Sequence, residues 1–294
     1  MSNTLAGVSL EQVSEMTLDL LADNFWMFSL FARNFSDSIR ERGDRTVTRV
    51  PSSVSVLDLS NGYTASDVST TEIEIELSNF KGFSMAFSEY EIAKAKSATI
   101  LERTFIRPAI DATAKAVADD LLALVTPGNF PTSQVRTAAN FDSDDLADAA
   151  ATMTGNKVPR GLRSCMLNAS YTSSLSKDGA IGVASAYGTP APIQDNIIST
   201  IHGFGITEYQ GIPTTNNLQG FYAHPSALCI AARQIARPNY GGAEVIDSIE
   251  PRTGLPVQFR KFFSPREGKY YLTCGILYGV AKGQSNSLIR ITNI

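Results

Sequence analysis

Alternation of apolar and charged residues marks the segment around residue 75 as a β-strand. Residues 72–77 read Glu-Ile-Glu-Ile-Glu-Leu, and Phe83, Met85 and Phe87 continue the period of two. This period is typical of a half-buried strand. The earlier segment 45–59 is rich in valine, threonine and leucine, and Asn61-Gly62 is a hairpin turn signal. The pattern predicts a two-stranded ribbon over residues 44–92.

The predicted ribbon is too long to be stable alone. Each arm has about fifteen to twenty residues, which gives a reach of about 50 Å at 3.3 Å per residue. Two strands bury too little apolar surface to hold such a structure in water, and their free edges recruit other chains. We therefore expect the ribbon to lie on another protein, most simply on a second copy of the same chain.

Helical spacing of apolar residues follows in residues 97–125. One stripe carries large residues such as Ile110, Val117 and Leu121, and a second carries mostly small ones, including Ala109, Ala112 and Ala116. Two stripes predict a helix packed on both sides, kinked or split at Pro108. Leu18, Leu21, Phe25 and Phe28 recur at spacings of three and four and predict a helical arm over residues 1–43. The apolar run 25–31 within this arm is expected to dock on other protein.

The remainder mixes helices and strands without a repeated βαβ unit. We expect helices over 143–154 and 170–175, a strand over 163–167, further strands between 197 and 231, and a β-rich end from residue 255. Asp144 and Asp145 suit the first turn of the helix that begins at 143. The irregular order predicts an α+β fold.

Composition narrows the function. With 43% hydrophobic and 18% charged residues and a net charge of −4, the chain resembles ordinary globular proteins and lacks the excess charge of a general duplex-binding protein. No run approaches the roughly twenty apolar residues of a membrane helix. The three widely spaced cysteines, Cys165, Cys229 and Cys274, are expected as buried thiols in an intracellular protein.

Motifs for chemistry are sparse. The two histidines belong to no metal-ligand cluster, and no phosphate-binding glycine loop is present, so we expect no metal and no cofactor. A hydrolase site built from His224 with Ser226 or Cys229 is an alternative, although a base two residues from its nucleophile rarely has the right geometry. The one basic concentration faces either nucleic acid or acidic groups of a neighbouring subunit; it comprises Arg33, Arg40, Arg42, Arg45 and Arg49.

The order of arm, ribbon, long helix, mixed region and closing β segment resembles the major capsid proteins of tailed bacteriophages, with the architecture named after phage HK ninety-seven. The resemblance covers nearly the whole chain. No single motif is diagnostic; it is carried by the passage from 87–91 to 106–111, and by segments 203–213, 220–228 and 271–280.

This resemblance implies a division of the chain. Residues 1–43 would form the N-terminal arm, 44–92 the extended β-hairpin loop, 93–129 with 246–294 the peripheral domain around a spine helix, and 130–245 the axial domain. The first lysine is Lys81, so no amine is available at the ribbon tip for covalent cross-linking.

The implied function is a non-enzymatic shell protein that assembles in the host cytoplasm into the pentamers and hexamers of a virion head around duplex DNA. Scaffolding, portal and decoration proteins are further expected partners, and no membrane is involved. The alternatives are an encapsulin-like compartment and the small hydrolase. Side chains expected at subunit interfaces are Trp26, Phe31, Arg40, Arg42, Arg49, Ile73, Glu74 and Ile75.

Overall fold

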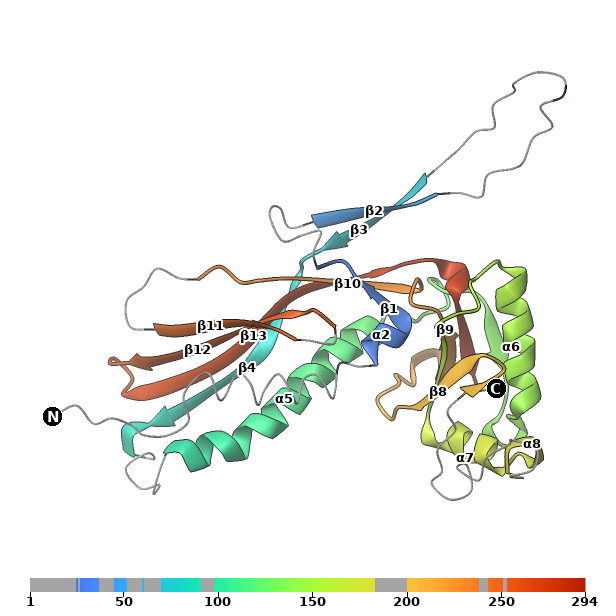
Figure 1. Ribbon diagram of the computed structural model, residues 1–294. Helices are drawn as coiled ribbons and strands as arrows, with labels where there is room; N and C mark the ends of the chain where they lie inside the picture. Colours follow the sequence, from blue (N-terminus) through green and yellow to red (C-terminus); the bar gives the residue numbers. More distant parts are fainter. Residues whose placement is uncertain are drawn as a thin grey trace.

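Two β-sheets lie side by side in the computed structural model, and a separate two-stranded ribbon rises from the first of them (Figure 1). The structure describes residues 25, 27–36, 45–51, 60, 70–90, 98–182, 200–237, 243–250 and 253–293. The mixture of sheets and helices agrees with the predicted α+β class. No helix among these described residues is long and apolar enough to cross a membrane.

The first sheet is built around the long central strand β13. Strands β10 and β12 pair with one edge of β13, and β4 pairs antiparallel with its other edge. Helix α5 (Ala98–Leu122) lies across one face of this sheet (Figure 1). The strands of the first sheet are β1 (Ala32–Asn34), β4 (Asn79–Ser88), β10 (Leu228–Arg233), β11 (Ala243–Ile249), β12 (Pro256–Ser264) and β13 (Lys269–Lys282).

The second sheet has the order β5-β14-β9-β6-β8-β7, and helices α6, α7 and α8 contribute to its core. Leu146, Ala149 and Met153 of α6 are buried in one cluster with the sheet residues Cys165 and Tyr222. The elements are β5 (Ser133–Val135), α6 (Ser143–Gly155), β6 (Arg163–Leu167), α7 (Ala169–Lys177), α8 (Gly179–Gly182), β7 (Thr200–Ile201), β8 (Phe204–Glu208), β9 (Leu218–Ala223) and β14 (Leu288–Thr292), with 3-10 turns at Ala138–Asn140, Thr215–Asn217 and Ser285–Ser287.

Local chemistry explains where α6 begins. The Asp142 carboxylate accepts hydrogen bonds from the backbone N–H groups of Asp144 and Asp145, and the Asp145 carboxylate accepts one from the N–H of Asp142. This reciprocal capping satisfies backbone donors that the first helical turn leaves free. The helix predicted at 143–154 is therefore confirmed, as is the strand predicted at 163–167.

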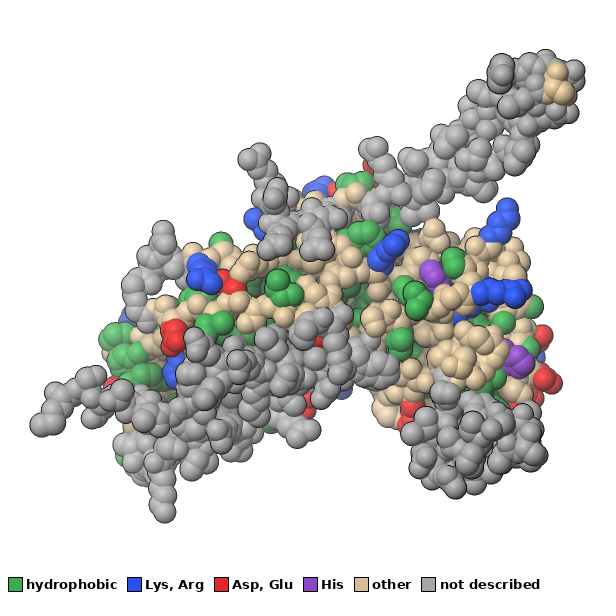
Figure 2. All heavy atoms as spheres, viewed as in Figure 1, with side chains coloured by type: hydrophobic (Ala, Val, Ile, Leu, Met, Phe, Trp, Pro, Cys, Tyr) green, Lys and Arg blue, Asp and Glu red, His purple; other side chains and the backbone are tan. Residues whose placement is uncertain are grey.

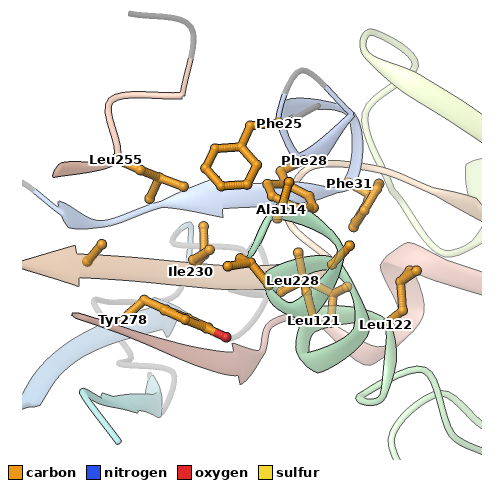
Figure 3. Packing of buried hydrophobic residues seen from close by; sticks show 14 of the residues in the cluster. Phe25, Phe28, Phe31, Ala114, Leu121, Leu122, Leu228, Ile230, Leu255 and Tyr278 are labelled. Atoms are coloured by element: carbon orange, nitrogen blue, oxygen red, sulfur yellow. The ribbon is translucent and has the colours of Figure 1, made fainter. Parts of the chain in front are cut away.

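The N-terminal aromatic residues pack inside their own chain. Phe25, Phe28 and Phe31 are buried against α5 and β10, close to Ala114 and Leu228 (Figure 3). The expectation that this run docks on other protein is wrong for these three residues. The predicted helical arm is interrupted, because α2 (Phe28–Phe31) is followed by β1, whose parallel pairing with β10 is invisible to local periodicity; residues 37–43 of the predicted arm lie outside the described residues.

Helix α5 differs from its prediction in two respects. The predicted split at Pro108 does not occur: α5 continues through this residue as one helix, because the exposed proline removes a single backbone donor. Its small-residue stripe is not buried: Ala112 is exposed, and Ala109 and Ala116 are half-buried. Packing on both sides is therefore wrong for this stretch of the single chain.

The predicted return arm of the ribbon is also shorter than expected. Residues 79–88 form β4, which pairs with β13 from Asn79↔Tyr278 to Ser88↔Lys269. Phe83 and Met85 pack against the core of the first sheet. The alternation does mark a strand, but its neighbour is β13 and not the first ribbon arm, because a period of two does not specify which strand lies alongside.

The strands of each sheet do not all come from one of the residue ranges expected for the peripheral and axial domains. Strand β10 lies within 130–245 but belongs to the first sheet, and β14 lies within 246–294 but belongs to the second. The chain therefore crosses between the sheets at the β9–β10 turn and again between β13 and β14. Both crossings depend on long-range pairing that the sequence pattern does not encode.

Candidate subunit interface

The ribbon consists of β2 (Arg45–Pro51) and β3 (Thr70–Glu76), which pair antiparallel from Arg45↔Glu76 to Pro51↔Thr70. In Figure 1 the two strands lie above the first sheet and lead away from it. Each pairs only with the other among the described residues. A ribbon of this kind exposes backbone donors and acceptors along its edges, which is the property that allows it to pair with or lie on another chain.

The base of the ribbon is anchored to its own chain by its apolar face. Ile75 is fully buried and forms a small cluster with Cys229 and Ala231 of β10, with Ile73 and Leu77 packed beside it. The alternating isoleucines thus identify a buried face, as the sequence predicted. The surface that buries this face at the base belongs to the same chain.

A glycine allows the chain leaving the ribbon to cross the sheet closely. A Cβ atom built on Gly279 of β13 would lie 2.0 Å from the carbonyl oxygen of Glu76, which is far inside van der Waals contact. Any other residue would push the end of β3 away from the sheet. Gly279 therefore determines how closely the end of β3 approaches the first sheet.

The other face of the ribbon is charged. Arg45 lies opposite Glu76 and Arg49 opposite Glu72 in the pairing register. The Arg45 guanidinium also forms a 2.9 Å ion pair with Glu74, with both side chains more than half exposed. The sequence leaves two partners open for the arginines of the basic concentration, DNA or the carboxylates of a neighbouring subunit. Arg45 is instead paired with a carboxylate of its own chain.

The residues expected at subunit interfaces differ in how far they are buried within the single chain. Phe31 and Ile75 are fully buried within the single chain, so their burial is accounted for without a neighbour, whereas Ile73 is half-buried and Glu74 is exposed. Arg49 is described only through its backbone in β2. Trp26, Arg40 and Arg42 lie outside the described residues.

Beyond the anchor, the same face of the first sheet carries an open groove of about 420 Å³. The floor of the groove is formed by Gly82 and Gly275, which lie opposite each other in the pairing of β4 with β13. Phe80 rises beside this floor with 64% of its surface exposed, and Phe262 lines the other end. Sequence reasoning missed this surface because it assigned Phe80 and its neighbours to the ribbon.

His224 and Ser226 do come together, contrary to the geometric expectation. The His224 Nδ1 atom lies 2.8 Å from Ser226 Oγ and accepts a hydrogen bond from the Ser226 backbone N–H at 3.2 Å. Ser226 Oγ in turn donates to Ser287 Oγ at 2.8 Å. Burial, together with the charges of Arg163 and Arg33, lowers the pKa of His224 and favours the neutral ring.

This cluster lies where the chain crosses between the sheets. The N–H of Gly283 donates to the carbonyl of Ala227 at 2.8 Å, and the N–H of Gln284 donates to that of Ser226 at 2.9 Å. Ser226 and Ser287 join the same two segments through their side chains. Among the described residues no carboxylate is hydrogen-bonded to His224, and Cys229 packs beneath the ribbon. The arrangement therefore supports a structural role, in which the cluster holds the two crossing segments together, better than a catalytic triad.

The three cysteines are free and buried, as predicted. Burial raises the pKa of the Cys229 thiol to about 11 and also raises the pKa values of Cys165 and Cys274. In the described part of the chain, no group of three or more histidine, cysteine, aspartate or glutamate side chains is placed to hold a metal ion.

Comparison with solved structures identifies the fold. The chain is similar to a structure titled "Mycobacterium phage Che8", with 18% identity, a TM-score of 0.64 and coverage of 90% of each chain. It is also similar to the "Capsid structure of the Cyanophage P-SCSP1u" (12% identity, TM-score 0.63, 91% of this chain and 88% of the other) and to the "Asymmetric unit of bacteriophage PhiM1 mature capsid" (12%, 0.61, 90% and 86%).

No family model matches the sequence, and no curated protein matches it either. The likeness is thus one of three-dimensional structure, at an identity too low to carry more than the fold. It extends over about nine-tenths of the chain in each of the three cases. The chain has the fold of phage capsid proteins.

Proposed function

We propose that this chain is the major capsid protein of a tailed bacteriophage, which assembles into an icosahedral head around double-stranded DNA. The observation that carries the proposal is the shared fold: solved phage capsid structures cover about nine-tenths of this chain and are themselves covered to a similar extent. A match over about nine-tenths of both chains supports a common architecture better than a match to one shared domain would.

In this assignment α5 is the spine helix, the first sheet belongs to the peripheral domain, and the second sheet with α6 and α7 forms the axial domain. The ribbon is the extended loop, which reaches a neighbouring subunit beyond its own anchor. The open groove at Phe80 supports further contact between subunits, because a side chain with 64% of its surface exposed gains by burial.

The mechanism is the repetition of modest contacts around closed symmetry. Each ribbon and each domain edge buries surface on an adjacent copy, and the contacts add because all of them form together. Lys81 donates to Asp120 of its own chain, which supports a shell held without covalent links through this lysine. A net charge of −4 suits an inner wall that does not grip packaged DNA tightly.

No catalytic step is part of this function. The His224 cluster pins two crossing segments together, and its serine hydroxyl is engaged with Ser287. Portal and decoration proteins and a separate scaffolding protein are partners compatible with this assignment, with assembly in the host cytoplasm and the virion as the final location.

Electron microscopy of the purified, overexpressed protein tests the proposal. We expect closed particles tens of nanometres across, and a protein that stays monomeric at high concentration would overturn it. A matched variant replaces residues 52–69 by Asn-Gly, which joins the paired positions Pro51 and Thr70 through a two-residue turn. It should keep the thermal unfolding temperature of the body and lose assembly.

Two further measurements separate the alternatives. Particles from an infected culture should hold nuclease-resistant duplex DNA; particles that hold a protein cargo instead would favour the compartment. An ester-hydrolysing activity that disappears in both His224→Ala and Ser226→Ala would favour the hydrolase.

A further inference from the structure

The turn between α6 and β6 presents a leucine to solvent on a constrained backbone. Leu162 has 79% of its surface exposed, the largest value among the exposed apolar side chains of the described residues. Its φ angle is +60°, and that of Lys157 in the same turn is +59°. Apart from glycine and occasionally asparagine or aspartate, residues avoid this region, and such outliers concentrate where function requires them. We call Lys157, Arg160 and Leu162 the basic knob.

The knob is held rigidly by the buried guanidinium that follows it. Arg163 donates to the carbonyls of Val158 at 2.7 Å, Pro159 at 2.9 Å and Ala150 at 3.1 Å. Ala150 belongs to α6, whereas Val158 and Pro159 belong to the turn, so the guanidinium links the helix to the turn. The turn is thereby fixed on both sides, and the leucine is displayed in one position. Figure 2 shows basic side chains projecting at this corner, at the upper right.

A complementary surface lies between α5 and the end of β8. It is a cleft of about 460 Å³, which we call the acidic cleft. Buried Ala114 and Ala118 lie in its lining together with half-buried Tyr209, and the carboxylates of Asp111 and Glu208 stand exposed at its edge. The other lining residues are Met27, Lys115, Gln210 and Gly211.

The knob and the cleft lie at opposite ends of two neighbouring parallel strands. Strands β6 and β8 pair from Arg163↔Phe204 to Leu167↔Glu208. The knob immediately precedes β6, whereas Glu208 ends β8. Five strand residues separate the two positions by about 13 Å or more at 3.3 Å per residue. The knob therefore does not reach the cleft of its own chain along this path, but a copy placed beside it brings the two surfaces together.

We propose that the basic knob of one copy inserts into the acidic cleft of the next. Leu162 would cover the half-buried apolar lining at Met27 and Tyr209, while Lys157 and Arg160 would face Asp111 and Glu208. An apolar centre with a charged rim is the usual anatomy of a protein interface and does not suit a phosphate backbone. Because the two surfaces differ, the contact is head-to-tail, and a head-to-tail contact closes into a ring when the rotation permits. The inference rests on the proposed function and adds the contact that joins copies within a capsomer.

Charge exchange tests the pairing. Arg160→Glu and Glu208→Lys should each raise the protein concentration needed for assembly at least tenfold, as measured by light scattering, and the double variant should recover most of the loss. Gly161→Ala is the matched control in the same turn, because a Cβ there meets no atom within 4 Å. It should assemble like the unmodified protein.

Leu162→Asn separates an assembly role from a folding role. Asparagine tolerates a positive φ, so the thermal unfolding temperature of the unassembled chain should stay equal or rise while assembly weakens. Normal assembly of both Leu162→Asn and Arg160→Glu would overturn the knob contact and leave the capsid proposal standing. A double charge exchange that fails to recover assembly, or an Arg160→Glu shell that forms normally but retains less DNA, would overturn it as well. An unmodified protein that never assembles would defeat the capsid proposal itself.

Discussion

Lys81 on β4 and Asp120 on α5 form an ion pair, with the ammonium group 2.7 Å from the carboxylate. The hydroxyl of Tyr278 on β13 donates to the same carboxylate at 2.5 Å, and this tyrosine is fully buried. Burial and the adjacent Asp120 raise the pKa of Tyr278, so the phenol remains a donor at any ordinary pH. One aspartate thus ties the long helix to two strands of the first sheet.

Removing Asp120 should lower the free energy of unfolding more than removing Lys81 does. Asp120→Ala leaves the buried Tyr278 hydroxyl without its acceptor and should cost about 2–3 kcal/mol of unfolding free energy. Lys81→Met removes only a partly exposed ion pair and should cost about 1 kcal/mol or less. Urea unfolding of an assembly-deficient background measures both. Lys115→Met, on the exposed side of α5, is the control, and equal losses for the two variants would contradict this account.

The thiol of Cys229 should report whether the ribbon base is docked. It is buried beneath Ile75, and its pKa of about 11 leaves roughly one thiol in a thousand ionised at pH 8. In a background with Cys165→Ala and Cys274→Ala, Ile75→Ala should therefore accelerate labelling by a thiol reagent about tenfold or more. Leu146→Ala, in the separate core of the second sheet, should leave the rate unchanged. Equal rates for Ile75→Ala and the parent would show that the ribbon base does not shield this thiol.

Elements with a local chemical signal were predictable from the sequence. The helix expected at 143–154 is observed as Ser143–Gly155, because Asp142 caps its start through neighbouring backbone groups. The strand expected at 163–167 is observed with these bounds. The three cysteines are buried as expected from their apolar surroundings. In each case the signal that predicts the element, a capping residue or an apolar run, lies within a few residues along the chain.

Elements defined by distant partners were not predictable. The same alternation fits β4 in the ribbon or in the first sheet, and only pairing with β13 decides between them. Phe31 reads equally well as an interface residue or a core residue until its contact with Phe221 is seen. The positive φ of Leu162 carries no sequence signal, and the acidic cleft requires Asp111 and Glu208 to be brought together from distant segments.

Acid should weaken the junction between the two sheets through His224. Its pKa in the folded chain is lowered by burial and by Arg163 and Arg33, so the unfolded chain binds the proton more tightly. Stability should therefore decline as the pH falls below about 6.5, and the decline should level off below the folded pKa. In His224→Gln this part of the pH dependence should disappear from thermal unfolding curves. An unchanged pH profile would rule out His224 as its source.

Two glycine-to-alanine substitutions should differ in their effect on the free energy of unfolding. A Cβ on Gly279 would lie 2.0 Å from the Glu76 carbonyl, so Gly279→Ala should displace the ribbon base and cost about 2–3 kcal/mol or more, as overpacked sites do. Gly155 closes α6 with no atom within 4 Å of its added Cβ, so Gly155→Ala should be neutral or add up to about 1 kcal/mol. Denaturant unfolding measures both. Since the backbone at Gly279 cannot retreat from Glu76 without lifting β3, the Gly279 variant should also expose Cys229 to labelling, whereas a stability loss without such exposure would place the damage elsewhere in β13.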